Sequence, residues 1–206
     1  MRKTLDDGRP RLVAKHGEPE TAFFSRVLDN WKAREAFERS KSDRALGVHG
    51  SGNLRDAQMA DNLRWLAEVR YPGKKIVCWA ATFHQARGLA GVTMDGNSKY
   101  YEDCRNMGQG VHEAFGKTCY TVGFAANGGR AGSFSWQSDL QPPKEGSVED
   151  TLHRYGAPFL FVDLRRAGPF GKPLRMSPMS YSRDIEARWP DVLDAVLFID
   201  EMTPAR

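Results

Sequence analysis

The sequence VCWAATFHQAR, residues 77–87, passes from an apolar run into a polar segment. The run from 75 to 81 is apolar and includes β-branched residues, a pattern typical of a buried strand. Polar side chains then follow, among them Thr82 and His84. The stretch therefore predicts a core strand over 75–81 whose carboxyl end opens into a loop. In open α/β sheets, functional groups gather at such strand ends.

Three more short apolar runs predict strands at 119–125, 159–164 and 194–200. Helix-like segments alternate with them, which indicates an α/β layered domain with a mostly parallel sheet flanked by helices. The Gly-rich NGGRAG at 127–132 predicts a hairpin turn, with SFSW (133–136) as the return strand.

Helices are expected where apolar side chains recur at helical spacing or where capping residues bound a segment. The polar segment 1–17 is interpreted as an irregular arm, and 18–206 as one domain. Residues 84–102 are expected to form a long loop. The expected helices are 18–46, with an apolar stripe through Phe23, Val27, Trp31 and Phe37, then 54–71, 104–116, and one capped by Ser147 that stops at Gly156.

Composition limits the classes of partner. The chain has 206 residues, 40% of them hydrophobic, and a net charge of +4 that is spread along the sequence. This pattern argues against nucleic-acid binding, which requires a basic stripe. No segment approaches the ~20 apolar residues of a membrane span. The three cysteines lack a CxxC pairing and the N-terminus lacks an apolar signal core, so a cytoplasmic protein is expected.

Two side chains stand out as candidates for chemistry. His84 follows the predicted strand and could activate water, because the histidine pKa lies near neutrality. It could equally bond a loop carbonyl and serve structure alone. Arg55 shares a helix face with Met59 and could hold an oxyanion, or it could be a solvated arginine at a helix end.

Other signatures are lacking. The histidines show no HxxxH or HxH spacing, so no metal is expected, and no cofactor motif is present. There is no GxSxG, which disfavours a nucleophile-elbow serine hydrolase.

Taken together, five segments resemble the erythromycin esterase family. Members typically read RDxxMAxN-x-x-W, then a strand ending in WAHNxH, an MG before a helix, a Pro-Gly-Ser-x-Glu region, and FDA near the C-terminus. The matching segments are RDAQMADNLRWL (55–66), KIVCWAATFH (75–84), NMGQGVHEAFGKTCYTVGF (106–124), EGSVEDTLHRYG (145–156) and VLDAVLFID (192–200).

The resemblance implies hydrolysis of carboxylic esters, including the macrolactone of erythromycin, and hence a role in macrolide resistance. It implies attack by water without a covalent enzyme intermediate and without a metal or other cofactor. Arg55 matches the arginine of the family's RD motif, and His84 matches the second histidine of WAHNxH. The implied partner is a small-molecule ester or macrolide, not nucleic acid or a membrane.

The chain departs from the family in two respects. Ala81 and Thr82 stand where the family has His-Asn. The resemblance also covers only the C-terminal half of the family, so a partial version of its fold is expected, with self-association or a companion N-terminal half. Two main functions stay open, a hydrolase using His84 and Arg55 and a non-catalytic remnant or binding module. A third is a hydrolase or transferase whose site is rebuilt around His84, His112 or the 85–103 loop.

Overall fold

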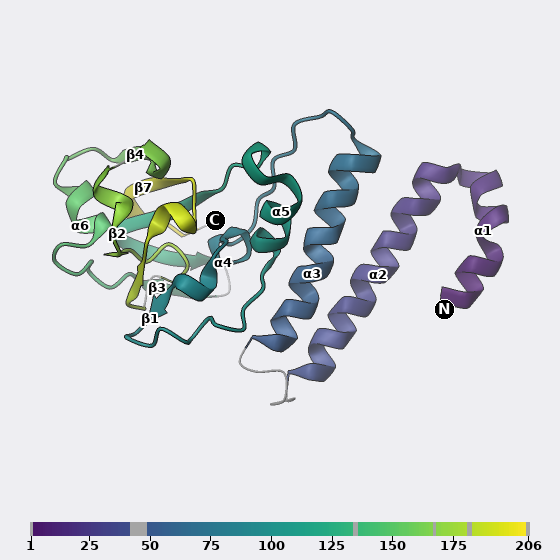
Figure 1. The fold of residues 1–206 in the computed structure, drawn as a ribbon, viewed down its shortest axis with the longest axis horizontal. Helices are drawn as coiled ribbons and strands as arrows, with labels where there is room; N and C mark the ends of the chain where they lie inside the picture. The colour runs from purple at the N-terminus through teal and green to yellow at the C-terminus, as the bar shows by residue number, and fades with distance from the viewer. Residues whose placement is uncertain (1, 42–48, 134–135, 167, 181–182, 205–206) are drawn as a thin grey trace. The chain divides into compact units, whose positions relative to one another are not determined.

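The computed structural model confirms the α/β class. It describes residues 2–41, 49–133, 136–166, 168–180 and 183–204. Contacts divide the chain into two compact units, Met1–Cys78 and Trp79–Arg206, so the range 18–206 covers parts of both. Each unit is described by itself (Figure 1). Within the described ranges, no helix combines the length and the apolar character that crossing a membrane requires.

The first unit is helical. It contains α1 (Arg2–His16), α2 (Glu18–Ser40), α3 (Gly50–Trp65) and a π-helical turn at Leu66–Arg70 that continues α3. The prediction of an irregular arm was wrong, since residues 2–16 form α1. Arginine, lysine and leucine are good helix formers, so a polar segment can be helical when a neighbour such as α2 packs on it. The last residues expected in α2, 42–46, lie outside the described residues.

Helices α2 and α3 lie side by side and are joined by polar contacts. Arg26 pairs with Asp61, and Arg70 pairs with Glu20. The apolar stripe predicted for α2 does not form a buried face, because Trp31 is 70% exposed. Arginine side chains also lie over aromatic rings across the two helices, Arg26 over Trp65 and Arg55 over Phe37.

The second unit is built on a four-stranded sheet with the order β3-β2-β7-β4. Strands β2 and β7 are parallel, whereas β3 and β4 join antiparallel. The prediction of a mostly parallel sheet was therefore wrong, because β3 follows β2 after a short connection and such connections produce antiparallel pairs. The strands are β2 (Val122–Ser133), β3 (Trp136–Asp139), β4 (Phe159–Asp163) and β7 (Ala195–Met202).

The expected strand at 75–81 is absent, and these residues have no regular secondary structure. Val77 is 90% exposed and Trp79 is 82% exposed. A strand exists only where a neighbour accepts and donates its backbone hydrogen bonds, and β-branched composition alone does not supply that neighbour. His84 therefore follows an exposed, irregular segment rather than a core strand.

The glycine-rich turn predicted at 127–132 lies inside β2. Gly128 pairs with Glu201 and Gly129 pairs with Met202 of β7. A Cβ on Gly129 would lie 2.2 Å from the Met202 carbonyl oxygen, so this glycine permits close strand approach rather than a turn. The chain reverses after Ser133, where residues 134–135 of the expected return strand lie outside the described residues.

Short elements complete the unit. The segment expected as a loop, 84–102, contains ordered turns and a strand that joins a small sheet of order β1-β6-β5. Helices α5 and α6 confirm the expected helices at 104–116 and after Ser147. The elements are α4 (Thr82–Gln85), α5 (Met107–Phe115), α6 (Val148–His153), β1 (Thr93–Met94), β5 (Leu174–Arg175), β6 (Ile185–Ala187) and 3₁₀ turns at 89–91, 116–118, 164–166, 168–171 and 189–191.

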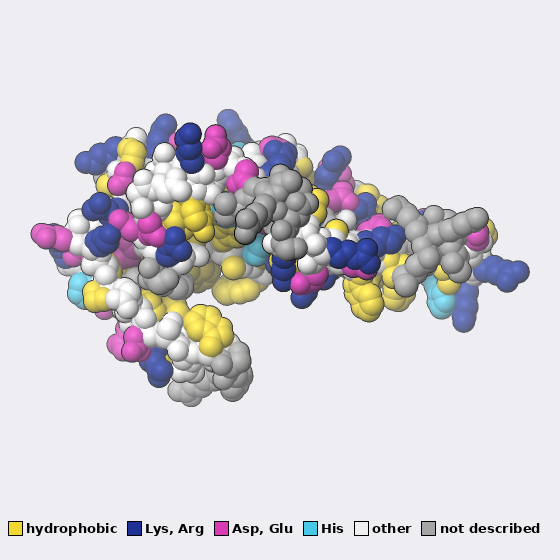
Figure 2. Space-filling model, turned by 90° about the horizontal axis from the view of Figure 1, so that it is seen from below, with side chains coloured by type: hydrophobic (Ala, Val, Ile, Leu, Met, Phe, Trp, Pro, Cys, Tyr) yellow, Lys and Arg dark blue, Asp and Glu magenta, His cyan; other side chains and the backbone are white. Residues whose placement is uncertain are grey.

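The core of the second unit lies between its sheets and turns. Trp189, Phe198 and Ile185 are fully buried in it. Charged side chains of both signs are interspersed on the molecular face that Figure 2 shows. Among the described side chains drawn on this face, none of the Lys and Arg residues join into a continuous basic stripe of the kind that phosphate backbones require.

Candidate active site

His84 lies on the single turn α4, in the second unit. The turn is closed by hydrogen bonds from the His84 amide to the Ala81 carbonyl (2.9 Å) and from the Ala86 amide to the Thr82 carbonyl (2.9 Å). The His84 ring is half-buried and packs edge-on against Phe83, with 5.3 Å between ring centroids. The imidazole is therefore presented from a short, hydrogen-bonded turn.

Helix α5 holds this turn from one side. The Asn106 side chain donates to the Phe83 carbonyl while its oxygen accepts from the Gln109 amide (3.2 Å), which caps α5. A Cβ on Gly108 would lie 2.1 Å from the Gln85 carbonyl oxygen, so only glycine allows the first turn of α5 to approach α4 this closely. The backbone before and after His84 is fixed as a result.

A buried ion pair holds the other end of α4. Arg87 donates to both carboxylate oxygens of Asp194, at 3.1 and 3.0 Å, and also to the Pro190 carbonyl at 3.0 Å. Asp194 also accepts from the Thr121 amide at 2.7 Å. These contacts tie the exit of α4 to the residues that lead into β2 and β7, so the sheet positions the turn that carries His84.

The two residues that replace the family's His-Asn have different surroundings. Ala81 is exposed and precedes α4. Thr82 is buried, and its methyl carbon would lie 3.1 Å from a Cβ placed on Gly123 of β2. Position 81 is therefore open to a larger side chain, whereas position 82 is packed against the sheet.

Arg55 belongs to the first unit, so the structure describes it apart from His84. It lies in α3, where its guanidinium carbon is 5.9 Å from the centroid of the Phe37 ring on α2. The next residue, Asp56, is buried. The two predicted site residues are thus placed in different units, and the site is assembled here only around His84.

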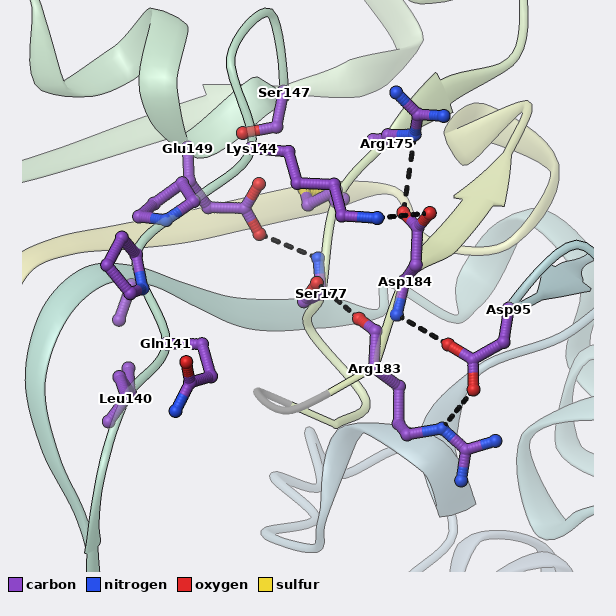
Figure 3. A pocket seen from close by; sticks show the side chains of 14 residues that line it. Asp95, Leu140, Gln141, Lys144, Ser147, Glu149, Arg175, Ser177, Arg183 and Asp184 are labelled. Carbon is purple, nitrogen blue, oxygen red and sulfur yellow. Dashed lines mark hydrogen bonds and ion pairs between the residues drawn. The ribbon is translucent and has the colours of Figure 1, made fainter.

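A separate polar cavity of about 390 Å³ lies elsewhere in the second unit (Figure 3). Neither His84 nor Arg55 lines it. Its most buried charged side chain is Glu149 on α6, which accepts a hydrogen bond from the Ser177 amide at 2.6 Å. Opposite, Asp184 accepts from Lys144 at 2.6 Å and pairs with Arg175 at 3.3 Å. The cavity thus combines a buried carboxyl group with paired charges at its mouth.

Burial raises the pKa of Glu149 above its ordinary value of 4.5, against the opposing effect of the Ser177 hydrogen bond. A carboxyl with a raised folded-state pKa favours folding at low pH, and that contribution is lost as the pH rises through the folded-state value. Glu149→Gln keeps an acceptor for Ser177 but cannot ionise. Urea melts between pH 4 and pH 8 should show the variant gaining stability over the wild-type chain as the pH rises. A difference that does not vary with pH would contradict the prediction.

Sequence reasoning missed Glu149, Arg87 and Asp194. Glu149 belongs to the Gly-Ser-x-Glu segment, but its sequence position also suits an ordinary acid in a first helical turn. Asp194 lies in the VLDAVLFID segment, at the start of the predicted strand. An aspartate at the start of a strand is the sequence feature that could have marked it as a partner for a cation. In the described residues, no group of three histidine, cysteine, aspartate or glutamate side chains is arranged to hold a metal ion.

Comparisons with known proteins give the chain its relatives. A protein of Bacillus subtilis (strain 168) named "Putative hydrolase YbfO" is 28% identical over 166 residues, which are 74% of this chain and 35% of that protein. The chain thus spans about a third of the length of this relative.

Solved structures with 15–17% identity share the fold. A succinoglycan biosynthesis protein matches with a TM-score of 0.60 over 96% of this chain and 60% of that one. A mutant of the erythromycin esterase EreC in its open conformation matches with a TM-score of 0.59 over 96% and 50%. A Bacillus cereus protein matches with a TM-score of 0.56 over 89% and 52%. The family model described as Erythromycin esterase matches residues 1–202, and the chain belongs to this family.

Proposed function

We propose that the chain is a hydrolase that cleaves carboxylic ester or macrolactone bonds with water, with His84 as the base that activates the water. Membership of the erythromycin esterase family and the similarity to a protein named as a hydrolase support the reaction class. The single observation that carries the proposal is the turn that holds His84, which α5 and the Arg87–Asp194 pair fix from two sides. A general base must be held in one orientation to be effective. The fixed backbone of this turn supports that requirement for His84.

In the proposed reaction, the His84 imidazole accepts a proton from a water molecule as its oxygen attacks the ester carbonyl carbon. The carbonyl electron pair moves to oxygen and gives a tetrahedral oxyanion. When the oxyanion collapses, the bond to the alcohol oxygen breaks and that oxygen takes the proton from His84. Arg55 is proposed to stabilise the oxyanion, a role that rests on its match to the RD motif. The products are a carboxylic acid and an alcohol, or an opened hydroxy acid from a macrolactone.

The experiment that tests this proposal is hydrolysis by the purified chain in water enriched in ¹⁸O. Erythromycin and p-nitrophenyl acetate serve as substrates, and mass spectrometry follows the products. We expect one ¹⁸O atom in each new carboxyl group, because water attacks the carbonyl. A chain with a folded circular-dichroism spectrum that leaves both substrates intact would contradict the proposal.

Restoring the family residue at position 81 should increase the rate. Ala81 is exposed and adjoins α4, so Ala81→His adds a second titratable group close to His84 without displacing core atoms. A general acid or base increases the rate of an enzymatic reaction by about 10²–10⁴-fold. We therefore expect kcat/KM of Ala81→His to exceed that of the wild-type chain by about tenfold or more. Ala81→Gln is the matched control, since it adds a polar side chain that cannot titrate near neutrality. Equal rates for the two variants would show that the gain is not acid–base catalysis.

The alanine at position 81 also supports a second function. Ala81 carries no proton to transfer where the family has a histidine, which supports a non-catalytic module that retains ligand binding. Calorimetric titration of the wild-type chain with erythromycin distinguishes the two. Binding without hydrolysis, and without any gain in Ala81→His, would support the binding module in place of the hydrolase.

A further inference from the structure

The cavity of Figure 3 has the size and the wall chemistry of a ligand site. Its volume of about 390 Å³ lies within the range of small-molecule pockets, roughly 300–1,000 Å³. Its lining comes from three segments that are distant in sequence, around residues 140–149, 175–177 and 183–184, together with Asp95 and Ala126. The fold thus brings polar groups from separate parts of the chain to one open pocket.

Apart from Glu149, the charged side chains that line this cavity are paired with one another. Lys144 and Arg175 share Asp184. Arg183 donates to Asp95, which also accepts from the Asp184 amide at 2.9 Å. An anionic ligand would have to compete with these carboxylates for the same cations. A hydroxyl group can instead accept from a cation and donate to a carboxylate at once, so it can join the network without breaking a pair.

Apolar side chains also line the cavity. They come from a short stretch before α6 and from the core of the second unit. The residues are Ala126, Leu140, Pro142, Pro143 and Met176. Ala126 and Met176 are buried, so this surface is fixed. A wall with an apolar face and hydrogen-bonding edges matches a sugar ring, which has C–H faces and hydroxyl edges.

A buried acid anchors the inner end. Glu149 is only 4% exposed, and one of its oxygens is held by the Ser177 amide. Ser147, Ser177 and Gln141 also line the cavity, and Figure 3 labels them. Their side chains can both donate and accept hydrogen bonds.

We propose that this cavity binds an uncharged polyhydroxylated ligand, a sugar ring or a short glycan, with Asp184 and Glu149 as its hydrogen-bonding anchors. The site is separate from the one proposed for ester hydrolysis, since His84 and Arg55 do not line it. Its presence therefore does not depend on whether the chain hydrolyses esters.

The test is a titration of the full ¹⁵N-labelled chain with D-glucose and with maltose, followed by the amide signals of Ser147 and Ser177. We expect saturable shifts of both signals. Asp184→Asn keeps the side-chain shape but removes the charged acceptor, and should weaken binding about tenfold. Asp139→Asn, at an exposed pair with Arg130, is the matched control and should leave the affinity unchanged.

Several outcomes would overturn the proposal. Shifts that stay linear with sugar concentration would show that there is no site. Saturable shifts with sodium phosphate but not with glucose would show an anion site instead. An unchanged affinity in a folded Asp184→Asn would remove the proposed anchor. If that variant does not fold, Gln141→Ala at the exposed rim replaces it, with a loss of about threefold expected for a neutral hydrogen bond and an unchanged affinity contradicting the site.

Discussion

Replacing His84 by alanine should lower kcat/KM for ester hydrolysis by about 10²–10⁴-fold, the usual contribution of a general base. The expected loss is large because the turn α4 presents this ring from a fixed backbone. The His84 amide is bonded to Ala81, and Asn106 of α5 holds the carbonyl of Phe83. Removing the imidazole leaves that backbone intact, so the variant should fold while losing the proton acceptor. Initial rates with p-nitrophenyl acetate and erythromycin measure the effect.

The matched control for this variant is His153→Ala. His153 lies on α6, where its Nδ1 is 2.6 Å from Asp200 and its side chain is half exposed. The same chemical change there should leave kcat/KM nearly unchanged, because His153 lies on α6 and not on the turn that carries His84. Equal rates for the wild-type chain and His84→Ala would place the chemistry elsewhere, and a rebuilt site at His112 would be the next to test.

Local sequence signals predicted the elements that local chemistry defines. Ser147 caps α6 by accepting from the Asp150 amide at 3.2 Å, and Asn106 and Gly116 bound α5. The apolar runs at 159–164 and 194–200 became β4 and β7, because each lies beside a partner strand. The residues of these elements marked them correctly, and for β4 and β7 the fold also supplied the partner strands.

The errors have a common physical origin in contacts between distant segments. The run 75–81 has strand composition, yet no neighbouring strand in the described structure pairs with it, and Val77 is exposed instead. Gly129 has the sequence signature of a turn, but its conformation serves close approach to Met202, 73 residues later. A glycine that reverses the chain and one that admits a neighbouring strand are identical in sequence. Only the fold separates the two.

The candidate site shows the same limit. His84 could be selected from the sequence because its family match marks it. Nothing in the sequence connects Arg87 to Asp194, which lie 107 positions apart, or reveals that Glu149 is buried. The residues that position the site were therefore missed, although the residue proposed to act in it was found.

Removing the Asp194 carboxylate should destabilise the chain by about 3–5 kcal/mol, the usual cost of leaving one member of a buried ion pair alone. The side chains of Arg87 and Asp194 are only 10% and 11% exposed. In Asp194→Ala, the guanidinium loses both of its carboxylate hydrogen bonds, and the Thr121 amide loses its acceptor. The variant should melt at a markedly lower urea concentration, as measured by circular dichroism.

The matched control is Asp139→Ala. Asp139 pairs with Arg130 between β3 and β2 at 3.1 Å, but its side chain is 83% exposed. Water screens such a pair, so the loss should stay below about 1 kcal/mol. If Asp194→Ala costs no more than this control, the buried pair does not hold the sheet to α4 and the proposed support of His84 is wrong.

A double variant separates the pair from its surroundings. In Arg87→Ala with Asp194→Ala, neither charge is left buried alone, so the total loss should be less than the sum of the two single losses. A substantial residual loss is still expected, because the Thr121 amide has lost its Asp194 acceptor in the double variant. The same variants also test whether the ion pair positions the turn that carries His84. If the ion pair positions α4, kcat/KM of each folded single variant should fall below the wild-type value. A rate that stays at the wild-type value in folded Asp194→Ala would show that α5 alone positions the histidine.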